Sequence, residues 1–355
     1  MTRVPQGTVG QEREIPKITD HKQGSAHPDE ITDIQINENG AILLLSPKNV
    51  AEELRTVARS KNTRIAYARA WKQFAKYCDT RGIEPERACS KDIAEFFTRL
   101  ALQPSGATGR PLSLATLKIY RSALNRHYAE AERNSPAATT RVSDVFGGLA
   151  RLRGHTPRRV KALREHEIKA MLDKCPSGRF GCRDAAMLAL GFAAALRRSE
   201  LCGLAFSDID ILRDNKMVVC IRRSKTDQDG KGQLVAVPEG RTIRPISHLC
   251  AWLDLAGIRD GYLFQTFRRG GTPSGKPLNH GEVSRLVKKY ATRIGLDSTD
   301  YSGHSLRAGF VTSAAAHRAR LDKIMEVTRH RNPTTVLQYI RDADAFENHA
   351  GANFL

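Results

Sequence analysis

The segment His304–Tyr339 begins HSLRAGF and ends RHRNPTTVLQY, and the rest of the chain is organised around it. A helix that opens at His304 would place Arg307 on the same face. Arginine offers a rigid fork of donors for phosphate oxygens, and histidine exchanges a proton near neutral pH. Further on, an Asn-Pro turn lies between His330 and Tyr339 and would bring a hydroxyl beside the first pair. Each residue alone is more often structural, so the interpretation depends on the remaining sequence.

Net charge is the most unusual feature of the composition. The 355 residues include 57 Lys and Arg against 38 Asp and Glu, which gives a net charge of +19 and a pI near 9.9. Such an excess indicates a polyanionic partner, most commonly nucleic acid. A membrane surface is the alternative, but no apolar run approaches the roughly 18 residues that span a bilayer, and no signal peptide follows Met1. We therefore expect a soluble intracellular protein that binds no membrane.

The cysteine pattern indicates neither disulfides nor a metal site. The number of cysteines is odd, and no C-x-x-C pair occurs among Cys78, Cys89, Cys175, Cys182, Cys202, Cys220 and Cys250. The sequence also lacks a G-x-x-x-x-G-K-S/T phosphate loop. We expect reduced thiols and no cofactor, so that any phosphate chemistry would rely on side-chain cations.

The N-terminal part divides into a polar tail and a helical module. Residues 1–50 contain 5 Lys or Arg and 7 Asp or Glu with little helical periodicity, which predicts a flexible acidic tail with a short strand near 41–45. In residues 51–150, apolar side chains recur at helical spacing in four segments, as at Tyr67, Trp71 and Phe74. This pattern predicts a helical DNA-binding domain with basic outer faces.

The stretch 151–162, RLRGHTPRRVKA, breaks the apolar periodicity and is rich in Arg and Lys. It predicts a basic interdomain linker that lies against the phosphate backbone. Candidate DNA contacts on the helical module and this linker are Lys72, Lys118, Arg121, Arg158, Arg159 and Lys161.

Residues 163–355 are predicted to form a second domain that mixes helices with a small antiparallel sheet. The apolar run 182–195 predicts a buried helix. The β-prone runs 216–223 and 233–238 flank an Asp-Gly turn and predict a hairpin, and 262–267 predicts another strand before a flexible segment at 270–275. The fold class is therefore mainly α. On a later helix, Arg285 and Lys288 are further candidate DNA contacts.

Two cations outside the opening segment have plausible chemical roles. Arg197 follows the buried helix directly and can be held rigidly, with Glu200 nearby to orient it. Lys225 lies where the first hairpin strand enters its turn, so it is either an edge-strand solubility device or a mobile proton donor. Lys231 is close and the hairpin register is open, so either lysine could be the acid.

The ordered set of Arg197, Lys225, His304, Arg307, His330 and Tyr339 closely resembles the tyrosine recombinase, or phage integrase, family. ALRRSEL matches the family's first Arg box, HSLR its His-x-x-Arg box, and RHRNPTTVLQY its last His and nucleophilic Tyr. The resemblance covers the two modules from about residue 55 onward. It implies a helical core-binding domain and an α/β catalytic domain that form a C-shaped clamp on DNA.

The resemblance also implies a reaction. Tyr339 would attack a DNA phosphate to form a 3′-phosphotyrosyl link without metal or ATP, while Arg197 and Arg307 clamp the phosphate oxygens. His304 would act as acid and base, and His330 would hydrogen-bond the phosphate. Lys225 would protonate the leaving 5′-hydroxyl, with Glu200 in a supporting role.

Family members recombine DNA as a tetramer through a Holliday junction. The resemblance therefore implies a homotetramer on double-stranded DNA with inverted half-sites. It also implies a bacterial or phage-encoded enzyme of the cytoplasm, associated with the nucleoid.

Three positions depart from the family pattern, and three rival functions remain. Gly is frequent where this chain has Ala195 and Arg329, and His is frequent where it has Ala308. A type IB topoisomerase or a telomere resolvase would use the same Tyr chemistry. A non-enzymatic helical DNA-binding protein would use these residues structurally. An integrase with a separate arm-site domain is disfavoured because the tail is acidic.

Overall fold

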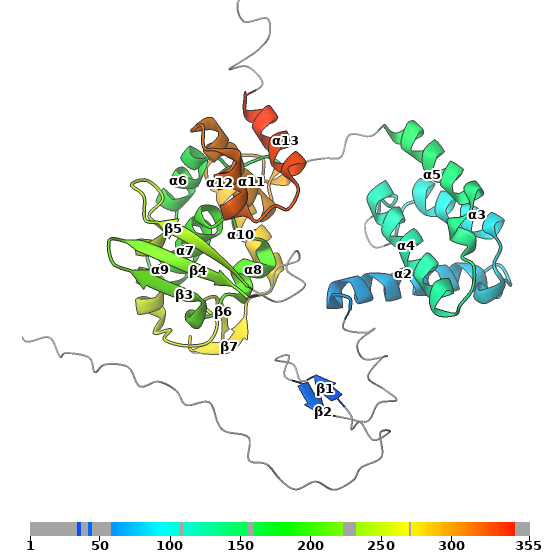
Figure 1. Cartoon of the computed structure of the whole chain (residues 1–355), viewed down its shortest axis with the longest axis horizontal. Coiled ribbons are helices and arrows are strands. Elements are labelled where there is room, and N and C mark those ends of the chain that lie inside the picture. The colour runs from blue at the N-terminus through cyan, green and yellow to red at the C-terminus, as the bar shows by residue number, and fades with distance from the viewer. Residues whose placement is uncertain are drawn as a thin grey trace, which may run out of the picture. The chain divides into compact units, whose positions relative to one another are not determined.

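The computed structural model describes most of both predicted domains (Figure 1). The described residues are 34–36, 42–44, 58–106, 109–154, 160–222, 232–269 and 271–344. Four candidate residues, together with most of the 1–50 tail, lie outside them: Arg158, Arg159, Lys225 and Lys231. The chain divides into two compact units, Met1–Thr156 and Pro157–Leu355.

The first unit is a helical module built on an aromatic core. Its helices are α2 (Lys61–Asp79), α3 (Ser90–Leu102), α4 (Leu114–Glu130) and α5 (Thr140–Arg153). The side chains of Ser60 and Ser113 accept backbone N–H groups at the starts of α2 and α4, which is typical N-cap chemistry. Phe96 packs edge-on against Phe74 with ring centroids 5.1 Å apart. A short antiparallel pair, β1 (Ile34–Ile36) and β2 (Ile42–Leu44), precedes the helices.

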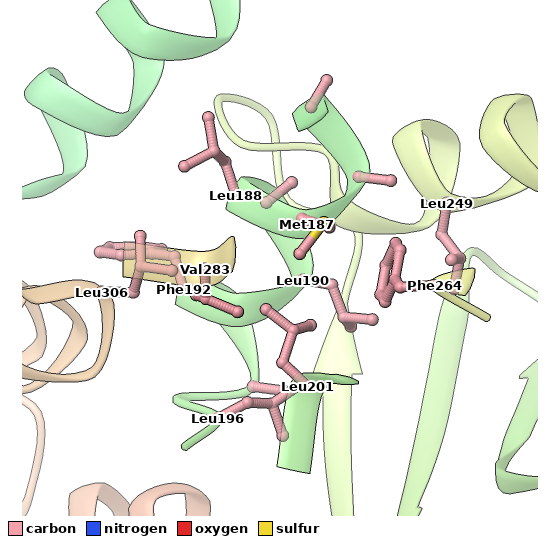
Figure 2. Packing of buried hydrophobic residues seen from close by; sticks show 14 of the residues in the cluster. Met187, Leu188, Leu190, Phe192, Leu196, Leu201, Leu249, Phe264, Val283 and Leu306 are labelled. Atoms are coloured by element: carbon pink, nitrogen blue, oxygen red, sulfur yellow. The ribbon is translucent and has the colours of Figure 1, made fainter. Parts of the chain in front are cut away.

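The second unit is mainly α-helical with small antiparallel sheets, as the sequence predicted. Its helices are α6 (Glu165–Asp173), α7 (Arg179–Ala193), α8 (Arg198–Gly203), α9 (Pro245–Ala256), α10 (His280–Arg293), α11 (His304–Ala316), α12 (Leu321–Thr328) and α13 (Pro333–Asp344). From Ala185 onward, helix α7 is buried on nearly all sides, since it carries only small and apolar residues there. Figure 2 shows its Leu190 and Phe192 among side chains from the neighbouring elements.

The sheets differ from the prediction in two places. The predicted hairpin is present as β4 (Lys216–Ile221) and β5 (Gln233–Pro238), but β3 (Ile209–Leu212) adds an unpredicted third strand. The prediction of a flexible segment at 270–275 was wrong for its described part, because β7 (Pro273–Pro277) pairs with β6 (Gln265–Phe267). The Gln265 side chain holds this pair by accepting the backbone N–H of Gly275 at 2.8 Å.

Two packing features fix the helix that begins at His304. Gly309 allows α11 to lie against the chain at Leu163, since a β-carbon on Gly309 would come within 1.7 Å of the Leu163 carbonyl oxygen. On its other side, α11 shares a small apolar cluster with α12 and α13, made of Val311, Ala315, Ile324 and Val336. Tyr339 packs against this cluster, which sets the position of its phenol.

Candidate active site

Arg197 is fixed at the junction between α7 and α8. The backbone leaves α7 through Ala195 in a left-handed conformation (φ 46°), and Arg197 then caps the start of α8. Its Nη1 donates to Glu200 Oε1 at 2.6 Å, and its backbone N–H donates to Glu200 Oε2 at 2.8 Å. Because the Glu200 side chain is only 2% exposed, this carboxylate holds the guanidinium in one orientation.

Arg307 is a buried guanidinium with unused donor capacity. The residue is 2% exposed, and its Nη1 donates to the Ala195 carbonyl at 2.8 Å. Its Nη2 is also buried but finds no hydrogen-bond partner among the described residues. Burial, then the charges of Arg197 and Arg329, lowers the pKa of Arg307 to about 9, so the group remains charged at pH 7. A buried, unpaired cationic donor is suited to receive an anion.

His304 contacts Tyr339 directly. The imidazole Nε2 lies 3.0 Å from the Tyr339 hydroxyl oxygen, which is hydrogen-bond distance. Burial, followed by the charges of Arg307, Arg198 and Arg197, lowers the pKa of His304. A neutral imidazole in this position can accept the phenolic proton.

His330 is held by the end of α12. Its Nδ1 lies 2.9 Å from the Thr328 hydroxyl oxygen, and that hydroxyl donates its own proton to the Ile324 carbonyl at 2.7 Å. Nδ1 must therefore be the donor, which leaves Nε2 without a proton in the neutral ring. Burial, then the charges of Arg307 and Arg197, lowers the pKa of His330 to about 4.

Arg329 belongs to the same cluster, although in the sequence it stood out only as a departure from the family pattern, which frequently has glycine here. Its side chain is 2% exposed and its Nη2 donates to Glu200 Oε2 at 2.7 Å. The backbone at Arg329 is left-handed (φ 57°), a conformation in which glycine is the least costly residue. Only this departure in the sequence drew attention to the position.

The structure thus brings five of the predicted residues together, with Glu200 behind them. They come from the α7–α8 junction, the start of α11, the end of α12 and α13: Arg197, His304, Arg307, His330 and Tyr339. Lys225 and its alternative Lys231 are outside the described residues, so their placement stays a prediction.

The candidate DNA contacts fall into two groups. Three lysines are exposed on α2, α4 and α10: Lys72, Lys118 and Lys288. The other described candidates already have protein partners. Lys161 pairs with Asp300 at 2.8 Å, and Arg285 pairs with Glu282 on its own helix.

Arg121 is the most strongly engaged of these candidates. Its Nε donates to the Ala137 carbonyl and its Nη2 to the Ser143 hydroxyl, both at 2.8 Å, and the guanidinium lies over the Phe146 ring. These contacts link α4 to α5, which gives Arg121 a clear structural role within the first unit.

The described part of the chain offers neither a metal site nor a membrane-spanning helix. It contains no group of three or more His, Cys, Asp or Glu side chains placed to hold a metal ion. None of its helices combines the length and the apolar character that crossing a bilayer requires.

Comparison with known proteins places this geometry in a family. Residues 161–345 match the model of the phage integrase family. An integrase/recombinase XerD homolog of Selenomonas ruminantium is 30% identical over 320 residues, covering 88% of this chain and 90% of the relative. The tyrosine recombinase XerD of Xanthomonas axonopodis pv. citri is 29% identical over 79% of this chain and 87% of its own length.

Solved structures show the same fold. A XerH site-specific recombinase bound to a palindromic difH substrate has a TM-score of 0.60 at 19% identity, covering 81% of this chain and 78% of that chain. A lambda integrase dimer bound to a COC′ core site has a TM-score of 0.54 at 20% identity, covering 82% and 75%. The family match over residues 161–345 and the 30% identity to the Selenomonas ruminantium relative show that the chain belongs to the phage integrase family and is a tyrosine recombinase, an enzyme of site-specific recombination.

Proposed function

We propose that this recombinase cuts and rejoins double-stranded DNA with Tyr339 as its nucleophile. His304 Nε2, 3.0 Å from the phenolic oxygen, accepts the phenolic proton as that oxygen attacks a backbone phosphate. The new oxygen–phosphorus bond forms a 3′-phosphotyrosyl link, and the bond to the 5′-oxygen breaks. The leaving oxygen takes a proton from Lys225, or from Lys231, and departs as a 5′-hydroxyl.

The environment of the Arg307 guanidinium is the observation that carries this proposal. Its Nη2 is buried and unpaired in the described structure, which is costly unless an anion arrives to accept from it. Arg197 lies close enough for its charge to act on Arg307 and on His330. Both guanidiniums would stabilise the phosphate oxygens as charge builds on them, and losing one such donor typically costs about 10²–10³ in rate.

The covalent link conserves the energy of the broken bond, so rejoining consumes no ATP. Attack by the 5′-hydroxyl of a partner strand gives strand exchange through a Holliday junction. Strand exchange between two duplexes requires a pair of active sites on the inverted half-sites of each duplex, and hence a homotetramer. The DNA-bound XerH and lambda integrase structures named above support DNA as the partner.

We further infer that residues 51–150 and 163–355 close on the DNA as a clamp joined by the 151–162 linker. The first unit would contribute exposed lysines such as Lys118, and the second would contribute Lys288. Because its substrate is double-stranded DNA, the enzyme would act in the cytoplasm, at the nucleoid.

A suicide substrate tests the proposal. Duplexes selected from a random pool by binding are nicked so that the short fragment with the 5′-hydroxyl diffuses away after cleavage. Wild-type protein should accumulate a covalent adduct, and Tyr339→Phe should bind with unchanged affinity and form none. A wild-type protein that binds its selected site tightly and never forms the adduct would support a structural role for these residues. A Tyr339→Phe variant that still forms the adduct would assign the nucleophile elsewhere.

A further inference from the structure

Two residues in left-handed backbone conformations meet behind the active site. Ala195 has φ 46° and Arg329 has φ 57°, and a side chain is disfavoured in this region because its β-carbon approaches neighbouring backbone atoms. The Arg329 side chain turns back to the end of α7, where Nη1 donates to the Ala194 carbonyl at 3.3 Å and Nη2 to the Ala195 carbonyl at 3.4 Å. The unfavourable backbone conformation of Arg329 thus occurs together with buried hydrogen bonds from its side chain.

The Glu200 carboxylate is shared between two guanidiniums. Oε1 accepts from Arg197 Nη1, while Oε2 accepts both from the Arg197 backbone N–H and from Arg329 Nη2. The Arg329 and Glu200 side chains are each 2% exposed, so this ion pair is shielded from solvent. Rotation of the carboxylate would break bonds to both arginines, and Arg329 therefore restricts the orientation of Arg197.

Arg329 also adds to the net charge of the cluster. Arg197, Arg307 and Arg329 carry three positive charges against the single negative charge of Glu200. Before DNA binds, with both imidazoles neutral, the net charge is two positive units. A phosphodiester carries one negative charge, and the five-coordinate transition state of attack carries two. Because the negative charge on the phosphate oxygens grows as the phenolic proton passes to His304, a fixed positive charge at Arg329 stabilises the transition state more than the bound substrate, which favours catalysis over mere binding.

We propose that Arg329 is a positioning residue for DNA cleavage, which orients Arg197 through Glu200 and adds a positive charge behind the scissile phosphate. The inference rests on the proposed function, because it concerns the same phosphate. It assigns a role to Arg329, which occupies a position where glycine is frequent in the family. Arg329 does not need to touch the phosphate for this role.

The experiment compares charged and neutral substrates. Cleavage is timed in single turnover on the suicide duplex with a normal scissile phosphate, and on one with a methylphosphonate, in which a methyl group replaces one charged oxygen. Arg329→Met should slow cleavage of the phosphodiester by roughly tenfold or more, at DNA affinity within about twofold of wild type. On the methylphosphonate, where less charge develops, the defect should shrink to less than about threefold.

Two further variants separate charge from folding. Arg329→Gly suits the left-handed backbone, so it tests the loss of charge even where Arg329→Met fails to fold. Arg329→Lys retains the positive charge without the forked guanidinium and should recover part of the cleavage rate. The matched control is Arg318→Gly, because Arg318 has the same backbone conformation (φ 56°) but is exposed, and its rates should equal those of wild type.

The outcomes distinguish the two proposals. Equal slowing on both substrates would mean that Arg329 only maintains the fold, and full activity of Arg329→Gly would mean that it has no role in cleavage. Either result overturns this inference alone, because wild-type protein still forms the adduct. If wild-type protein forms no adduct on its selected site, the proposed function fails, and this inference fails with it.

Discussion

The hydroxyl oxygen of Tyr339 lies 3.0 Å from Nε2 of His304, although 35 residues separate them along the chain. The contact depends on the small apolar cluster that packs α13 against α11. Tyr339 is therefore placed by helix packing, and His304 by the first turn of α11.

This contact predicts a rate defect for His304→Ala. Loss of a general base typically costs about 10²–10⁴ in rate, while DNA affinity should remain near that of wild type because the imidazole is neutral. Single-turnover adduct formation measures the change. His317→Ala is the control, since His317 lies at the end of the same helix with its side chain 73% exposed. If His304→Ala cleaves as fast as His317→Ala, His304 does not move the proton.

The lowered pKa of His330 predicts a pH dependence of stability. Its pKa is about 4 in the folded protein and near 6.5 when unfolded. Between these values the unfolded state binds more protons, so the free energy of unfolding should fall as pH falls from 6.5 to 4 and be fully restored above 6.5. After allowance for partial exposure, the loss is about 2 kcal/mol. Urea unfolding at pH 7, 6 and 5 measures it, and His330→Gln should flatten the slope. An unchanged slope in His330→Gln would assign the effect to other groups.

The hydrogen bond between His330 and Thr328 predicts proton uptake on DNA binding. With Nδ1–H directed to Thr328, Nε2 can donate to a phosphate only after it gains a proton. Binding of the selected duplex should therefore take up about one proton, which calorimetry in buffers of different ionisation enthalpy detects. Thr328→Val removes the acceptor at Nδ1, so the tautomer can shift and the uptake should fall. The same uptake in Thr328→Val would show that another group is protonated.

The different environments of Lys118 and Arg121 predict different defects. Lys118→Ala should lower DNA affinity and reduce the slope of log affinity against log salt by roughly one, with stability unchanged. Arg121→Ala should destabilise the first unit by about 1–3 kcal/mol, because one hydrogen bond from α4 to α5 and one to the turn before α5 are lost. Fluorescence anisotropy across a salt series and thermal unfolding measure the two effects. A stability loss in Lys118→Ala would indicate a structural role that its exposure does not suggest.

The sequence was informative where local pattern and chemistry coincide. The apolar run 182–195 predicted α7, and the placement of His304 and Arg307 on one face assumed a helix that the structure shows as α11. The sequence was uninformative for β7, whose Pro and Gly residues give no strand pattern and whose pairing depends on the side chain of Gln265.

Arg329 shows why the remainder of the site could not be predicted. An arginine is normally expected on the surface, and the partner that permits its burial, Glu200, is 129 residues away. Arg121 illustrates the reverse case. Its charge suggested a DNA contact, yet its donors are taken up by α5 and the preceding turn.

The hydrogen bond from Arg329 to the Ala195 carbonyl has a consequence for protein engineering and for the evolution of this protein. A segment transplanted from a relative with glycine at position 329 would leave Glu200 with one arginine, and the end of α7 would lose the donors of Arg329 and keep only that of Arg307. Substitutions at 195 and 329 should therefore show epistasis, each tolerated according to which residue occupies the other position. Chimeras of this recombinase should exchange both segments together.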